Sequence, residues 1–198
     1  MFYFLWFFIF FGCHKFQLEW LTQIIHPCGC IYFINNSLYE TCYYFSTFYY
    51  IADSVSILIN MDMKNSKNSI GFLIHHAVSL HLLSKHVNST LQSIVFDAYL
   101  ILEYSNIFLG VYSFIAYTFK KETIVYKLYT LIETIGYSYF RIICFGIEYK
   151  NNIMKVEIID LIFISLLYLL GIFWSFKLLK ISLSNFKKQD VIIANKEL

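Results

Sequence analysis

Long apolar segments follow one another along most of this chain, and charged residues rarely interrupt them. Only 14% of the 198 residues are charged, whereas 59% are hydrophobic and 21% are aromatic. A soluble domain carries about a quarter charged residues, and a small core cannot bury so much apolar surface. We therefore expect an all-α fold: a polytopic transmembrane helical bundle with no separate soluble domain.

The apolar segments have the lengths of membrane-spanning helices, which need about 20 mostly apolar residues. Four of them qualify clearly: residues 42–60, 91–119, 123–147 and 156–176. Two shorter stretches, residues 18–34 and 70–84, complete six core spans. Residues 1–12 form a seventh candidate; they lack the basic start and the small-residue cleavage site of a signal peptide. We expect a short N-terminal membrane segment in residues 1–17, a transmembrane domain in 18–180 and a tail in 181–198.

Lysines are distributed unevenly between the two sides of this layout. By the positive-inside rule the lysine-rich side is cytosolic, so the tail is expected in the cytosol. Both N-glycosylation sequons, Asn35-Asn36-Ser37 and Asn88-Ser89-Thr90, fall in the opposite, lumenal loops. The lysine-rich side holds Lys15, Lys64, Lys67, Lys120, Lys121, Lys177, Lys180, Lys187, Lys188 and Lys196, and the other side holds Lys85, Lys150 and Lys155.

Composition argues against several function classes. The net charge is only +2 and the lysines lie in short loops and the tail, so we expect no nucleic-acid partner. The five cysteines lie in or beside apolar segments, and Cys28-Gly29-Cys30 lacks the spacer of a redox or zinc motif, so we interpret them as packing residues. The six histidines lack the spacings of membrane di-iron enzymes, so we predict no metal.

Ionisable residues inside the expected spans are the main functional candidates. A charged side chain at a membrane centre costs roughly 2.5–3.5 kcal/mol, so four deep ones would together cost on the order of 10 kcal/mol if they faced lipid. They must be paired or face a polar cavity. Asp97 and Asp160 lie near helix ends, and we interpret them as interfacial. The full set is Asp53, His75, His76, His81, Asp97, Glu103, Glu133, Arg141 and Asp160.

Glu133, Tyr137 and Arg141 follow one another at intervals of four residues and form one polar stripe on a helix. One interpretation is an internal ion pair that holds helices together through another helix. The other is an anion site, in which Arg141 binds the phosphate or carboxylate of a lipid head group. The sequence leaves both interpretations open.

His75 and His76 are adjacent, so on a helix their side chains point about 100° apart and both rings can line one cavity. A buried imidazole tends to be neutral and is then available as a base or a nucleophile. A carboxylate from Asp53 or Glu103 can orient it. The alternative is a pair of histidines that only hydrogen-bond across helices.

Three motifs occur in a fixed order along the chain. They are Tyr-Tyr-Ile-Ala-Asp-Ser at residues 49–54, Gly-Phe-Leu-Ile-His-His-Ala-Val-Ser-Leu at 71–80 and Glu-Tyr-Ser-Asn-Ile-Phe at 103–108. This set resembles the TLC-domain family, which includes ceramide synthases, translocation-associated membrane proteins and small TLC-domain proteins. The resemblance covers residues 18–180. The chain's Phe, Tyr, Ile, Asn and Lys bias also suggests an AT-rich genome, such as that of a protist or a large virus.

The resemblance implies an endoplasmic-reticulum protein (in a host membrane if the chain is viral) whose helices surround a lipid-accepting cavity. In ceramide synthases the paired histidines are implicated in fatty-acyl transfer from acyl-CoA, which implies His75 and His76 as catalytic residues here. Asp53 and Glu103 would orient them, Arg141 would lie near the lipid head group, and acyl-CoA would be a co-substrate without a further cofactor. Glu103 and Asn106 replace the aspartate pair of ceramide synthases. The alternative is a non-enzymatic protein of lipid binding, sensing or trafficking.

Overall fold

The computed structural model describes residues 6, 8, 9, 12, 19–59 and 66–194, without the side chains of 19, 66–68 and 187–194. Every element in this part of the chain is helical, which confirms the expected all-α class. Most of the expected N-terminal segment 1–12 lies outside the described residues. The elements are α2 (Glu19–Asn35), α3 (Tyr39–Ile59), α4 (Ser66–His86), α5 (Gln92–Thr118), α6 (Ile124–Ser138), η2 (Tyr139–Cys144), α7 (Phe145–Asn152) and α8 (Ile158–Ala194).

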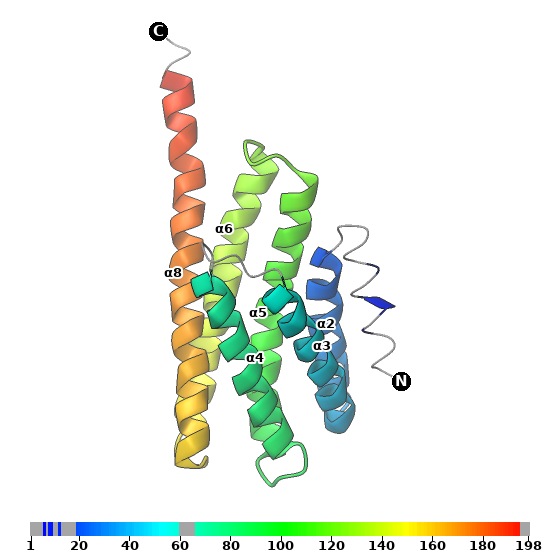
Figure 1. Ribbon diagram of the computed structural model, residues 1–198. Coiled ribbons are helices and arrows are strands. Elements are labelled where there is room, and N and C mark those ends of the chain that lie inside the picture. The colour runs from blue at the N-terminus through cyan, green and yellow to red at the C-terminus, as the bar shows by residue number, and fades with distance from the viewer. Residues whose placement is uncertain (1–5, 7, 10–11, 13–18, 60–65, 195–198) are drawn as a thin grey trace.

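The helices run up and down beside one another, so that chain neighbours are antiparallel (Figure 1). The loops after α2, α4 and α7 lie at one end of the bundle, and the α5–α6 loop and the C-terminal end of α8 lie toward the other (Figure 1). The two sequons begin in or beside the loops after α2 and α4, so both lie at the same end of the bundle, as the sequence predicted. Helix α8 continues through the expected tail to Ala194 and projects beyond the bundle.

Two helices, Gln92–Thr118 in α5 and Ile158–Phe186 in α8, are long and apolar enough to cross a membrane. The same criterion does not select the helices at the other expected spans. The expected segment 123–147 is divided among α6, η2 and α7, which follow one another without a break. The coarse expectation of membrane-length apolar helices is thus met by α5 and α8.

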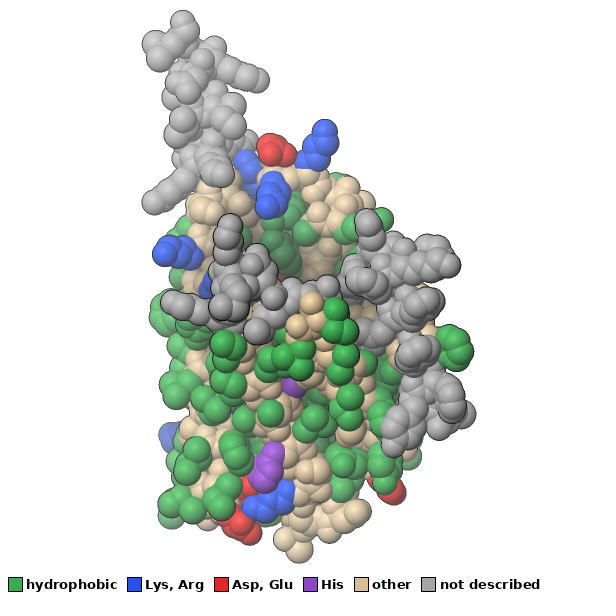
Figure 2. Space-filling model, viewed as in Figure 1, with side chains coloured by type: hydrophobic (Ala, Val, Ile, Leu, Met, Phe, Trp, Pro, Cys, Tyr) green, Lys and Arg blue, Asp and Glu red, His purple; other side chains and the backbone are tan. Residues whose placement is uncertain are grey.

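Large apolar side chains remain exposed on several helices. The middle of the face in Figure 2 is covered by hydrophobic side chains, whereas charged side chains gather toward its two ends. Contiguous exposed apolar surface of this kind marks a surface that meets lipid or another protein. Exposed members include Ile51, Val55, Leu58, Leu128, Ile132, Ile135, Ile162, Leu169, Phe173 and Phe176.

A π-helix, η2, interrupts the expected span at residues 123–147 and carries Arg141. Each π turn inserts one extra residue into a helix, and such insertions are frequent at functional sites. Arg141 is 1% exposed, and its stem lies against Gly171 of α8, where a Cβ would stand 3.3 Å from the arginine Cβ and Cδ. Glycine at position 171 therefore leaves room for the arginine stem.

The two residues interpreted as interfacial differ in exposure. Asp97 is exposed on α5, whereas Asp160, in the first turn of α8, is fully buried. The Asp160 carboxylate accepts hydrogen bonds from Lys85 Nζ at 2.9 Å and lies 2.9 Å from His86 Nε2. These contacts connect the end of α4 to the start of α8, which the sequence pattern could not reveal.

Candidate functional site

A cavity of about 350 Å³ lies inside the bundle between α2, α3, α4, α5, α6, η2 and α8. Its walls combine aromatic rings with ionisable groups from separate helices. Asp53, His75, His76, Glu133 and Arg141 all line it. Residues far apart in the sequence, each costly in a membrane, therefore converge on one polar space.

His76 is held from two sides by α3. Its Nε2 lies 3.4 Å from Asp53 Oδ2, and its Nδ1 lies 3.1 Å from the Ser54 hydroxyl. The Asp53 side chain is 29% exposed, whereas that of His76 is 5% exposed. Of the two carboxylates that the sequence offered, Asp53 is the one beside His76.

His75 is also buried, but its Nδ1 has no hydrogen-bond partner. Aromatic edges surround the ring, with Tyr50 at 6.1 Å and Trp174 at 5.8 Å between ring centroids. The His75 and His76 rings lie 5.7 Å apart and are tilted by 54°, so they do not stack. A buried nitrogen that faces a cavity without a partner is available to a ligand.

Arg141 is held by neutral groups of α5. Its Nε donates to the Ser105 hydroxyl at 2.7 Å, and one terminal nitrogen donates to Asn106 Oδ1 at 2.8 Å. The other terminal nitrogen, Nη1, has no partner. The guanidinium also lies over the Tyr137 ring, 5.3 Å from its centroid.

Glu133 and Arg141 do not pair directly within the described residues, whereas Asn106 of α5 links Arg141 to the carboxylate of Glu103. Glu133 Oε1 is buried without a hydrogen-bond partner, and the contacts of Arg141 are with the neutral Ser105, Asn106 and Tyr137. A buried arginine with one open nitrogen is a better match for the second interpretation, an anion site. Nη1 is an N–H donor without a partner in the protein, and Arg141 lines the cavity.

Glu103 has a different place from the one expected. It is fully buried, its Oε2 lies 3.5 Å from His26 Nδ1, and it accepts hydrogen bonds from Tyr50 at 3.4 Å and Asn106 at 3.1 Å. The prediction that Glu103 orients His75 or His76 is therefore not met, because the histidine beside the Glu103 carboxylate is His26 of α2. His26 stacks on Tyr49 at 3.8 Å and lines the cavity.

Sequence reasoning did not assign His26 to the candidate site, although it lies in the expected segment 18–34, beside Pro27. One signal could have revealed its role: His26 and Cys30 are four residues apart, so they share a helix face. Tyr50 was also missed, although it precedes Asp53 by three residues and turns toward the same space.

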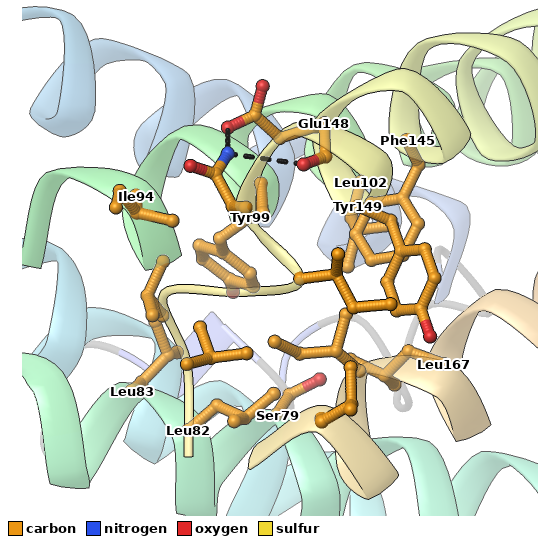
Figure 3. A pocket seen from close by; sticks show the side chains of 17 residues that line it. Ser79, Leu82, Leu83, Ile94, Tyr99, Leu102, Phe145, Glu148, Tyr149 and Leu167 are labelled. Atoms are coloured by element: carbon orange, nitrogen blue, oxygen red, sulfur yellow. Dashed lines mark hydrogen bonds between the residues drawn. The ribbon is translucent and has the colours of Figure 1, made fainter. Parts of the chain in front are cut away.

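A second, narrower pocket of about 40 Å³ lies between α4, α5, α7 and α8, and its walls are mostly apolar (Figure 3). Ser79 lines it, one helical turn after His75, and the Ser79 hydroxyl is buried without a partner. Figure 3 shows Leu82, Leu102 and Leu167 around the same space. Ligand pockets usually enclose roughly 300–1,000 Å³, so this space is a gap in the apolar packing.

In comparisons with known proteins, no family model matches this chain, and no curated protein and no solved structure matches it either. The geometry of the cavity is therefore the basis for its interpretation. A neutral imidazole can accept a proton or attack a carbonyl, and an arginine nitrogen can bind an oxyanion.

Proposed function

We propose that this chain is a multi-pass membrane protein with six core spans. Two observations support this arrangement. The helices alternate in direction, and the outer face of the bundle is apolar across its middle and charged toward its two ends (Figures 1 and 2). The described part of α6 through α7 runs without a break from Ile124 to Asn152, which is long enough to cross about 30 Å of hydrocarbon. The lysine distribution assigns the α5–α6 loop to the cytosol.

Cysteine labelling in sealed microsomes tests this topology. Lys121→Cys, in the exposed α5–α6 loop, is expected to react with an impermeant maleimide from the cytosolic side. Met154→Cys, at a position 92% exposed between α7 and α8, is expected to react only after detergent opens the vesicles. The unmodified chain, with its native cysteines, gives the background. Equal labelling of both positions in sealed vesicles would overturn the arrangement.

We further propose that the protein resembles TLC-domain proteins in function and transfers a fatty-acyl group into a membrane lipid, in the endoplasmic reticulum. One observation carries this proposal: His75, His76 and Arg141 face a single cavity with Asp53 against His76. The cavity of about 350 Å³ has room for a reacting head group.

The proposed reaction uses the two nitrogens that have no hydrogen-bond partner, His75 Nδ1 and Arg141 Nη1. An acceptor amine or hydroxyl attacks the carbonyl of an acyl thioester such as acyl-CoA; a C–N or C–O bond forms and the C–S bond breaks. His75 Nδ1, which has no partner, takes the acceptor's proton when the ring carries its own proton on Nε2, and then gives it to the leaving thiolate. Arg141 Nη1 binds the phosphate or carboxylate of the lipid.

Lipid profiling of cells that express the chain tests this function. Cells with the wild type are expected to show a shift in one lipid class or acyl-chain length that cells with the His75→Ala/His76→Ala double variant lack. The physical reason is that the double variant removes both imidazoles from the cavity and leaves Arg141 in place. The shifted lipid would identify the substrate.

His81→Ala is the matched control, because His81 lies on the same helix with a 43% exposed side chain. It is expected to behave as the wild type at equal membrane abundance. Identical profiles for the wild type, the double variant and an empty control would reject acyl transfer. They would favour the second function, a protein that binds or carries a lipid without changing it, for which the unpartnered Arg141 nitrogen is the supporting observation.

A further inference from the structure

A cluster of metal-binding residue types lies behind one wall of the cavity. One donor atom from each of His26, Cys30 and Glu103 can be chosen so that all three lie within 4.8 Å of one another. His26 and Cys30 are one turn apart on α2, and Glu103 faces them from α5. None of the three is more than 1% exposed.

The separations between the donors suit a tetrahedral ion. His26 Nε2 lies 3.4 Å from Cys30 Sγ, and the Tyr99 hydroxyl lies 3.5 Å from that nitrogen and 3.8 Å from that sulfur. Around Zn²⁺, with bonds of about 2.0 Å to nitrogen or oxygen and about 2.3 Å to sulfur, neighbouring donors stand roughly 3.3–3.7 Å apart. These three atoms therefore form a triangle close to one face of a zinc coordination sphere.

The surroundings of Cys30 are unusual for a packing thiol. A thiol has one weak donor and a weak acceptor, yet Cys30 Sγ has polar atoms of His26, Ser46 and Tyr99 within 3.8 Å. Apolar cysteines in a core normally contact carbon. Several polar atoms around one buried sulfur are the arrangement of a ligand shell.

Charge balance favours the same assignment. A thiolate from Cys30 and a carboxylate from Glu103 together neutralise a divalent cation, so the complete site carries no net charge with His26 neutral. A neutral buried site avoids most of the penalty of an isolated buried ion. Glu103 Oε2 lies 3.5 Å from His26 Nδ1, so the carboxylate and the imidazole are already adjacent.

We propose that His26, Cys30 and Glu103 bind one divalent cation of the Zn²⁺ type, with the Tyr99 hydroxyl beside the fourth position. Soft thiolate and imidazole ligands select such ions over magnesium or calcium. His26 also lines the cavity, so the proposed site lies directly behind that part of the wall. The sequence prediction of no metal is revised by this proposal, which is independent of acyl transfer.

Cobalt and zinc loading of the purified full chain in lipid nanodiscs tests the site. After treatment with a chelator, the wild type is expected to take up about one equivalent of Zn²⁺, measured by mass spectrometry of the metal. Loaded with Co²⁺, it is expected to show a near-ultraviolet band from the cobalt–thiolate bond. Cys30→Ser keeps the size of the side chain and is expected to lose both signals.

Cys28→Ser is the matched control, because Cys28 lies two residues away on the same helix and is exposed. It is expected to keep the band and the zinc. A wild type without a cobalt–thiolate band, or a Cys30→Ser variant that retains zinc, would overturn the proposal. The band in the wild type reports on the site even where Cys30→Ser does not fold, and neither readout depends on the lipid chemistry.

Discussion

His75→Ala is expected to lower the rate of acyl transfer by at least about 100-fold, because a positioned general base contributes roughly 10²–10⁴-fold. His75 lines the cavity, and its Nδ1 is buried without a hydrogen-bond partner. Asp53→Asn is expected to have a smaller effect, roughly 10-fold, since Asp53 acts through His76. We therefore expect His75→Ala to lower the rate of acyl transfer more than Asp53→Asn does.

The measurement is the initial rate of purified protein in nanodiscs, with the lipid identified by profiling and an acyl-CoA of matching chain length. His81→Ala controls for the loss of a histidine from α4 and is expected to retain the wild-type rate. Lipid binding, measured in parallel, is expected to persist in His75→Ala. A His75→Ala protein that binds lipid and transfers acyl groups at the wild-type rate would remove His75 from the chemistry.

Gly110→Leu is expected to lower the free energy of unfolding by about 3 kcal/mol or more, at the upper end of overpacking effects. A Cβ at position 110 would stand 2.7 Å from the carbonyl oxygen of Gln23 and 2.7 Å from Ile24 Cγ1. The oxygen belongs to the backbone of α2, so the helices must move apart. Pro27 has no N–H to donate to that carbonyl one turn earlier, which leaves the Gln23 oxygen facing α5.

Gly71→Ala is the control for glycine replacement within a helix, because its nearest neighbour, Trp174, would be 3.8 Å away in ordinary contact. It is expected to leave stability unchanged or to raise it slightly through better helix propensity. The transition temperature of the protein in detergent measures both variants. An equal shift in transition temperature for Gly110→Leu and Gly71→Ala would show that the close packing of α2 against α5 does not require glycine at position 110.

The apolar periodicity was enough to place most helices. The expected segments 42–60 and 91–119 agree with α3 and α5 within a few residues, because lipid-length apolar runs have few alternative structures. It also singled out Asp53, His75 and His76, since each is costly in an apolar segment. Their convergence on one cavity follows from that cost: a polar group excluded from lipid must find other polar groups.

The sequence could not fix which polar group meets which, because partners come from helices that are distant in the chain. The long apolar segments determined by themselves that the fold is helical. Most of the ionisable residues within them turn inward, whereas Asp97 and His81 are exposed. Only tertiary packing decided that Glu103 meets His26, that Arg141 sits on a π-helix against Gly171, and that Asp160 is buried against Lys85. Helix propensity is local, whereas rotation and pairing depend on how side chains of several helices fit together.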